Sequence, residues 1–378
     1  MVVRADTTFA PGVYRLPNGV TIGASGVTLD LNGATLAGAG YEGFGITCIG
    51  QDRVTIRGGI VRGYFYGVRV ERGSDLRIED NDLSYNWADE REPLPFLDIN
   101  AGPDLGDRRN LGGGLILRDV RRATVAGNTM RYGENGIDLY FVTASRVCGN
   151  VASDNIGWGI HLHRSSDNVI DFNVAERCTR PGLLDSAGVL AVMGSDWNAF
   201  VGNSLRGGGD GLFIGNEHGC PSNDNVVLWN DGSAAGANAF EATFSRGNLF
   251  LCNAAEASRY GFWLGYSHSG NVLSGNRIWG NRASGIEIEH GQSNVIEGNE
   301  ISGNGGHGIV LRTDGAVHFP RAAFPCLGLP DPAASRGYII RDNVLAGNRG
   351  GGIELIHTTD STIVDNLIAD EATAGEGG

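Results

Sequence analysis

Asparagine recurs through this chain at a nearly constant interval, and this repeat limits the possible folds more than any other feature. Most steps in the series are 22 or 23 residues, and the longer steps contain insertions. Each unit reads as three short segments of alternating apolar and polar residues with glycine or asparagine at the bends, which is typical of strands joined by turns. The repeated residues are Asn128, Asn150, Asn173, Asn203, Asn230, Asn253, Asn276, Asn299, Asn343 and Asn366.

A repeat of this length made only of strands predicts a solenoid of stacked coils. One buried asparagine per coil can then hydrogen-bond its equivalents above and below, forming a ladder, whereas an ordinary sandwich has no reason to repeat asparagine at a fixed phase. We therefore predict an all-β, right-handed parallel β-helix of about thirteen three-strand coils. The 61 glycines fit its many bends, and residues 1–378 show no linker, so we expect a single domain.

The repeat also resembles a known family. The units GIEIEHGQSNVIEGNEISGN at 285–304 and GIELIHTTDSTIVDN at 352–366 are similar to the parallel β-helix repeat of the pectate-lyase-like superfamily. That superfamily includes pectate lyases, polygalacturonases, alginate lyases, uronan epimerases and periplasmic copper-associated helices, so the resemblance implies a carbohydrate-active protein. It is specific only for architecture, because a fold does not fix a reaction, and the Asp-Pro-His-Asp signature of the epimerases is absent.

The composition of the chain excludes several classes of binding partner and of chemistry. The net charge of −14 argues against binding nucleic acid or an anionic membrane. The chain has no lysine, which excludes a lysine base or Schiff base, and its six cysteines lack zinc or redox spacing. No apolar run reaches membrane length and no leader precedes the repeat, so we expect a secreted or periplasmic protein only if a leader has been removed.

The ends and insertions of the solenoid carry further expectations. Residues 1–18 are expected to cap the open first coil. The tail at 370–378 is too short and polar to cover the last coil, so a homo-oligomer is expected as one way of covering it. The insertions 87–111, 179–187 and 315–335 all flank the first strand of a coil, where they would wall a groove.

The alternation of the first strand separates core from surface. Ile286 and Ile288 point inward, so Glu287 and Glu289 must point outward. The same phase in other coils gives an outward column rich in acids, imidazoles and aromatic rings, which suits a carbohydrate groove. Its members are Arg69, Glu71, Ile116, Arg118, Asp138, Tyr140, His161, His163, Phe213, Glu241, Thr243, Trp263, Glu287, Glu289, Val310, Arg312 and Glu354.

The first candidate catalytic set consists of carboxylates. Glu241 and Glu287 are two coils apart, roughly 9.6 Å at about 4.8 Å per strand, and inverting glycosidases hold their two carboxyls about 6.5–9.5 Å apart. Trp263 lies between them as a floor for a sugar ring. Glu289 is close enough to Glu287 to raise one of the two pKa values, and Arg312 on the next coil opposes this.

The second candidate set is Asp138, His161 and His163. Two imidazoles and a carboxylate can hold a divalent transition metal, or act as acid, base and substrate contacts, and the sequence leaves these alternatives open. We assign catalysis to Asp138 and His161 and substrate contact to His163, with no metal assigned. Further substrate contacts are expected from Tyr140, Phe213, Trp263, Tyr266, His268, His290 and Arg312.

Three function classes remain. A glycoside hydrolase acting on a neutral oligo- or polysaccharide by carboxylate acid/base chemistry fits the acidic column best and requires no cofactor. A uronide lyase or epimerase would need calcium on Glu241, Glu287 and Glu289, with Arg312 as base. A non-enzymatic adhesin or metal-handling helix is the third, although only three methionines argue against copper.

Overall fold

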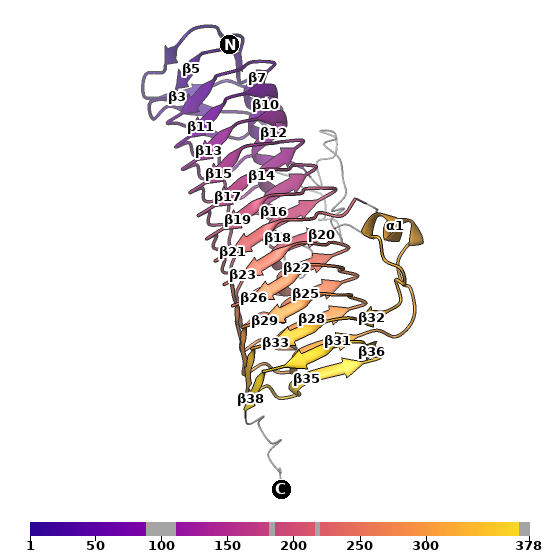
Figure 1. Cartoon of the computed structure of the whole chain (residues 1–378). Helices are drawn as coiled ribbons and strands as arrows, with labels where there is room; N and C mark the ends of the chain where they lie inside the picture. Colours follow the sequence, from indigo (N-terminus) through magenta and orange to yellow (C-terminus); the bar gives the residue numbers. More distant parts are fainter. Residues whose placement is uncertain (88–110, 181–185, 216–219, 370–378) are drawn as a thin grey trace. The chain divides into compact units, whose positions relative to one another are not determined.

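A computed structural model describes residues 1–87, 111–180, 186–215 and 220–369. Within these ranges nearly all regular structure is short strands, and the only helices are the 3-10 turn η1 (Arg321–Ala323) and α1 (Phe324–Leu327). Neither of these described helices has the length and apolarity needed to cross a bilayer. The chain divides into two compact units, Met1–Leu190 and Ala191–Gly378. Within each unit successive coils stack their strands in parallel (Figure 1).

In the first unit each coil contributes one strand to sheet A, one to sheet B and, in the first coils, one to sheet C. Strands of a sheet pair with the equivalent strands of the coils before and after. Sheet A holds β1 (Val2–Val3), β4 (Val20–Ile22), β7 (Phe44–Ile49), β10 (Tyr66–Ser74), β12 (Gly113–Arg121), β14 (Asn135–Tyr140) and β16 (Trp158–His163). Sheet B holds β2 (Thr7–Thr8), β5 (Thr28–Asp30), β8 (Thr55–Arg57), β11 (Arg77–Glu79), β13 (Thr124–Ala126), β15 (Arg146–Cys148) and β17 (Val169–Asp171), and sheet C holds β3 (Val13–Arg15), β6 (Thr35–Ala37) and β9 (Ile60–Arg62).

The second unit repeats this plan, and β18 (Ala187–Val192) contains the division between the units. Its sheet A strands are β20 (Asp210–Gly215), β22 (Asn238–Thr243), β25 (Tyr260–Gly265), β28 (Ile286–Glu289), β31 (His307–Arg312) and β35 (Gly351–Ile356). Sheet B holds β19 (Ala199–Val201), β21 (Val226–Leu228), β23 (Leu249–Leu251), β26 (Val272–Ser274), β29 (Val295–Glu297), β33 (Ile339–Arg341) and β37 (Thr362–Val364). Sheet C holds β24 (Ala254–Glu256), β27 (Arg277–Trp279), β30 (Glu300–Ser302), β34 (Val344–Ala346) and β38 (Leu367–Ala369), and β32 (Ser335–Arg336) pairs with β36 (Thr358–Thr359).

The predicted all-β parallel solenoid is confirmed, and its number of coils was slightly underestimated. In the part of the chain that the structure describes, 14 strands take the sheet A position, against the expected thirteen or so coils. Strands β1, β2 and β3 of residues 1–18 pair with β4, β5 and β6 as a further coil. The role of residues 1–18 as a cap and the single domain stay predictions.

The asparagine ladder is present and shows why the repeat exists. The backbone N–H and the side-chain Nδ2 of Asn230 both donate to Asn253 Oδ1, at 2.9 and 3.2 Å. Asn253 in turn donates from Nδ2 to Val227 O and to Asn276 Oδ1. The residue before each ladder asparagine takes a left-handed bend, as Gly275 does with φ 65°, which favours glycine there. One asparagine per coil thus satisfies the polar groups of a buried turn.

Candidate active site

The register of sheet A confirms the predicted phase. Inward side chains such as Ile137 and Ile160 are fully buried. The outward side chains align as expected within each unit, so the candidate residues do share a face. In the first unit the column runs Arg69, Ile116, Asp138 and His161, with Glu71, Arg118, Tyr140 and His163 beside it. In the second it runs Phe213, Glu241, Trp263, Glu287, Val310 and Glu354.

Asp138 is the centre of the cluster in the first unit and is completely buried. Tyr66 donates its hydroxyl proton to Asp138 Oδ2 over 2.6 Å, and Asn135 Nδ2 donates to both carboxyl oxygens at 3.0 and 3.2 Å. His161 Nδ1 lies 3.1 Å from Asp138 Oδ1. Burial and the charge of Asp138 raise the pKa of Tyr66 well above its usual range, which keeps the phenol protonated and donating.

This arrangement determines which nitrogen of His161 carries the proton. Because a carboxylate only accepts, Nδ1–H must be the donor to Asp138, so in the neutral imidazole Nε2 carries a lone pair. Nε2 has no hydrogen-bond partner among the described residues. A buried carboxylate that orients an imidazole in this way is the usual support for a general base. The structure therefore brings Asp138 and His161 together, as predicted.

His163 and Tyr140 complete this cluster but are far less accessible than expected of substrate contacts. Their exposed fractions are 4% and 1%, and their rings lie 5.1 Å apart. Burial lowers the pKa of His163 to about 3, with further contributions from the nearby His161 and Arg164. His163 is therefore neutral at physiological pH and cannot serve there as a cationic contact for an acidic sugar.

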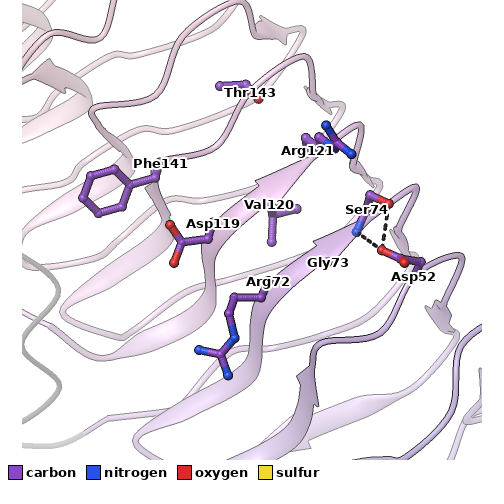
Figure 2. Close-up of a pocket in the computed structure, with 9 residues that line it drawn as sticks. All are labelled: Asp52, Arg72, Gly73, Ser74, Asp119, Val120, Arg121, Phe141 and Thr143. Carbon is purple, nitrogen blue, oxygen red and sulfur yellow. Dashed lines mark hydrogen bonds between the residues drawn. The ribbon is translucent and has the colours of Figure 1, made fainter.

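A pocket of about 390 Å³ opens next to this cluster, at the carboxyl ends of β10 and β12 (Figure 2). Asp52 sits at one side and accepts hydrogen bonds from the backbone N–H and hydroxyl of Ser74. Phe141 lines the other side, and its ring packs edge-on against His163, 6.2 Å away. Phe141 thus lies between this pocket and the buried imidazoles.

In the second unit, Glu241 belongs to a pair of carboxyl groups. Asn238 Nδ2 donates to Glu241 Oε2 over 2.6 Å, and the backbone N–H of Asn238 donates to Asp210 Oδ1 over 2.7 Å. Burial raises the pKa of Asp210 to about 7, although hydrogen bonds with Asn238 and Glu241 act to lower it. The pair therefore retains a proton close to neutral pH, as a proton donor must.

Glu241 lines a shallow pocket of about 260 Å³, together with Tyr260 and Trp263. Trp263 occupies the register position between Glu241 and Glu287, as the sequence predicted. Its side chain is half-buried and lines this pocket, so part of the indole is accessible to a ligand. This combination of a carboxyl pair and an indole face suits the hydroxyls and apolar faces of a sugar.

Glu287 points outward as predicted but is covered rather than exposed. Only 8% of it is accessible, because Arg312 Nε donates to Glu287 Oε1 over 2.9 Å. Arg312 also approaches Glu289, with Nη1 at 3.3 Å from Oε1. Burial acts to lower the pKa of Arg312, but its contacts with both glutamates raise it above the usual value. A guanidinium whose pKa is raised by these contacts argues against the alternative in which Arg312 acts as the base.

The other residues that were predicted to contact substrate differ in their burial and in their neighbours. His290 is fully buried and stacks on Tyr266, with ring centroids 4.6 Å apart. His268 is half-buried and contacts the hydroxyl of Ser269. Phe213 is half-buried and occupies the register position next to Glu241.

The sequence analysis did not identify the residues that donate hydrogen bonds to the outward carboxylates. Asn135, Asn238 and Ser284 stand three positions before Asp138, Glu241 and Glu287, and each donates to its acid. A polar residue at this spacing from an outward acid is a usable signal. Tyr66 and Asp210 gave no such signal, because neither is near its partner in sequence.

Parts of two expected groove walls lie outside the described residues, namely 88–110 and 181–185, as does His218. The third insertion, 315–335, contains η1 and α1. Its Phe324 and Leu327 pack with Phe244 and Tyr266. This insertion therefore covers the end of sheet A strands in the second unit, next to His290.

Comparison with known proteins agrees with the fold. The family described as "Right handed beta helix region" matches residues 18–205, 108–250 and 210–376. The chain belongs to the right-handed β-helix family. Handedness, the one feature of the predicted fold class that strand pairing alone leaves open, is thereby shown for this β-helix. Among curated proteins, none matches the sequence.

Solved structures similar to this β-helix include enzymes and phage proteins. The A-module of the Azotobacter vinelandii mannuronan C-5 epimerase AlgE6 aligns with TM-score 0.58 and 12% identity over 97% of this chain and 91% of that chain. Tailspike protein 3 of bacteriophage CBA120 gives 0.56 and 11% over 98% and 59%. The Dettilon tailspike protein gives 0.55 and 15% over 91% and 61%. These identities show the shared fold alone, in agreement with the resemblance to the pectate-lyase-like superfamily.

Proposed function

We propose that the protein is a carbohydrate-active enzyme and that its second unit hydrolyses a glycosidic bond by carboxylate acid/base chemistry. The observation that carries the proposal is the carboxyl pair formed by Asp210 and Glu241. Glu241 lines a pocket together with Trp263 and lies two strands from Glu287.

Glu241 is the proposed proton donor. It is half-buried and lines the Trp263 pocket, whereas Asp210 is buried. Because burial raises the pKa of Asp210 to about 7, the pair can keep one proton between its two carboxyls near neutrality. A glycosidic oxygen lying on the indole of Trp263 would then receive that proton from Glu241 as the bond breaks.

Glu287 is the proposed base. It is a carboxylate paired with Arg312 and also within 3.3 Å of the Ser284 hydroxyl. Strands two apart are separated by roughly 9.6 Å, which leaves room for a water molecule between a sugar and Glu287, as in enzymes that invert the anomeric centre. Only a small part of Glu287 is accessible, so Arg312 must turn aside when substrate binds.

The test is a panel of neutral and acidic glycans assayed for new reducing ends and for the ultraviolet absorbance of an unsaturated product. Hydrolysis gives reducing ends alone. Glu241→Gln should lower turnover about 10²–10⁴-fold, the usual contribution of general acid catalysis, while glycan binding persists. Glu300→Gln, at an exposed position on β30, is the matched control and should retain full turnover. Unchanged cleavage by Glu241→Gln would overturn the proposal.

One observation favours a second candidate, a uronide lyase or epimerase centred on the first unit. His161 Nε2 is a buried lone pair supported by Asp138, and both reactions begin when a base removes the C5 proton of a uronide. A mannuronan C-5 epimerase is among the similar structures. In this case His161→Gln abolishes turnover, Glu241→Gln does not, and a lyase also produces the ultraviolet signal. If neither variant changes anything while glycan binding persists, the protein is a non-enzymatic binder.

A further inference from the structure

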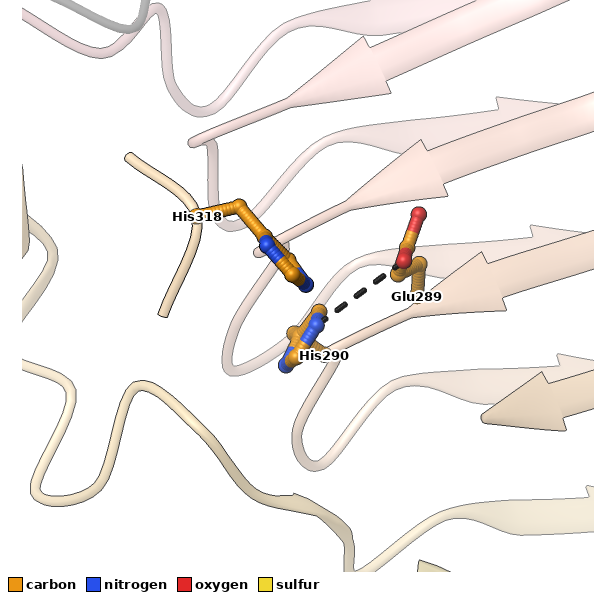
Figure 3. A group of neighbouring side chains, drawn as sticks. All are labelled: Glu289, His290 and His318. Carbon is orange, nitrogen blue, oxygen red and sulfur yellow. Dashed lines mark ion pairs between the residues drawn. The ribbon is translucent and has the colours of Figure 1, made fainter. Parts of the chain in front are cut away.

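Three side chains at the end of β28 in the second unit converge on one point. Glu289, His290 and His318 each place a potential ligand atom within 4.8 Å of the other two. Figure 3 shows the two imidazoles and the carboxylate turned toward one another. His290 Nε2 lies 3.8 Å from Glu289 Oε1 and 3.7 Å from Asp314 Oδ1. These distances are too long for hydrogen bonds.

The hydrogen bonds of Thr313 fix the tautomer of His290. The Thr313 hydroxyl has one proton, which it donates to Ala333 O over 2.7 Å. Its oxygen accepts from the backbone N–H of Gly315 and lies 2.9 Å from His290 Nδ1. Because that hydroxyl proton is already used, Nδ1–H of His290 must be the donor, and Nε2 carries a lone pair.

That lone pair is buried and lacks a partner. His290 is 0% exposed, and its Nε2 has no hydrogen-bond partner among the described residues. It faces two carboxylates, Glu289 and Asp314, which carry no proton to offer when ionised. The lone pair of His290 and the carboxylates of Glu289 and Asp314 supply donor atoms that a cation can accept. Arg312, with Nη1 3.3 Å from Glu289 Oε1, offsets part of the negative charge of Glu289.

We propose that Glu289, His290 and His318 bind a divalent transition metal ion, with Zn²⁺ as the expected occupant. Two imidazoles and one carboxylate form a ligand set typical of zinc sites that keep a position open for water or substrate. Ligand atoms around a tetrahedral zinc with bonds of about 2.1 Å are about 3.4 Å apart. The 3.8 Å separation of His290 Nε2 and Glu289 Oε1 is close to this value.

Neighbouring groups orient both imidazoles as ligands of a metal require. Thr313 fixes His290, and Asp314 Oδ2 contacts His318 Nε2 at 2.7 Å. Two further features restrain His290. Its backbone takes a left-handed bend with φ 54°, and its ring stacks on that of Tyr266 with 1° between the planes. Tyr266 in turn accepts a hydrogen bond from the backbone N–H of His318. The metal would therefore fasten the 315–335 insertion to sheet A.

The test uses the full chain, stripped with a chelator and titrated with Zn²⁺ alone by calorimetry. We expect one saturable Zn²⁺ per chain, and Co²⁺ in its place should give visible absorption bands. His290→Gln and His318→Gln should each weaken Zn²⁺ binding at least 100-fold, and Thr313→Val about 10–100-fold, as expected for loss of a supporting hydrogen bond. His357→Gln, at an exposed histidine outside the cluster, should bind Zn²⁺ as the unaltered protein does.

Two results would overturn the metal site. One is the absence of saturable Zn²⁺ binding to the unaltered chain. The other is unchanged affinity in His318→Gln, which is informative even if His290→Gln does not fold, because the His318 side chain is 46% exposed. Glu241→Gln should bind Zn²⁺ normally whatever its effect on turnover. Failure of the proposed hydrolase and failure of the metal site are therefore separate results.

Discussion

At the scale of single residues, the same local hydrogen bond recurs at three outward acids, Asp138, Glu241 and Glu287. A side chain at the entrance of a sheet A strand donates to an acid three positions later, from Asn135, Asn238 or Ser284. Asn135 and Asn238 are the first residues of β14 and β22, and Ser284 precedes β28. In the middle of an extended strand, positions three apart lie on opposite faces, so this contact belongs to the place where the strand begins.

Asp210 leads to a prediction about pH. Its pKa in the folded chain is raised to about 7 from an ordinary value of 3.8. Between these values the folded chain binds a proton that the unfolded chain releases, so the free energy of unfolding should fall as pH rises through this window. Asp210→Asn should flatten that part of the profile, as measured by urea unfolding from pH 4 to 8. Asp224→Asn, at an exposed aspartate of the same unit, should leave the slope intact, and an unchanged slope in Asp210→Asn would contradict the assignment.

His163 predicts the opposite sign. Burial lowers its pKa from 6.5 to about 3. Between these pH values His163 binds a proton in the unfolded chain but stays neutral in the folded chain. The free energy of unfolding should therefore fall as pH drops from 6.5 toward 3. His163→Gln should reduce this acid sensitivity in thermal unfolding measured at each pH. The exposed His357→Gln is the control, and equal acid sensitivity in both variants would show that His163 is not the responsible group.

At the scale of elements, the ladder turns should carry much of the stability of the coils. Asn253→Ala removes an acceptor from the N–H and Nδ2 of Asn230 and a donor from Val227 O. Asn230 Nδ2 keeps Phe200 O and Leu228 O as acceptors, so two groups, Asn230 N–H and Val227 O, lose a partner. Each buried group left unpaired costs about 1–3 kcal/mol, so we expect a loss of roughly 2–6 kcal/mol in urea unfolding of the unit. Asn366→Ala, at the half-exposed end of the ladder, should cost clearly less because water can replace its bonds. Equal losses would mean that the ladder adds little beyond a solvated turn.

The same elements show why the fold and part of the site were predictable from the sequence. Period and phase are local properties, so the ladder asparagines and the inward isoleucines fixed the coils and placed Glu241, Trp263 and Glu287 in one column. The burial of a side chain, in contrast, depends on residues that are distant in the sequence. Glu287 was expected in an open groove, but Arg312 covers it, and the proton on the Glu241 pair depends on Asp210, which is 28 residues before Asn238. Such partners are set by stacking of coils, which spacing alone does not reveal.

At the scale of the whole molecule, an apolar strand of a solenoid is buried by a coil on each side. Among the described residues, β35, β37 and β38 stand last in their sheets. Their apolar residues are correspondingly exposed, with Leu367 at 60%, Ile368 at 50% and Ile363 at 44%. Exposed apolar side chains beside strand edges are a common site of association.

We therefore expect this chain to self-associate through its last coil, as measured by sedimentation velocity. The net charge of −14 opposes association of two copies, so raising salt from about 0.05 to 0.5 M should strengthen it by screening that repulsion, since the Debye length is about 10 Å at 0.1 M. Ile363→Lys with Leu367→Lys should leave the chain monomeric, because each places a charge in the apolar contact. Phe172→Lys, which alters an equally exposed aromatic residue in the first unit, should associate normally. A chain that is monomeric at both salt concentrations, or a double variant that still associates, would show that the exposed coil is tolerated without a partner.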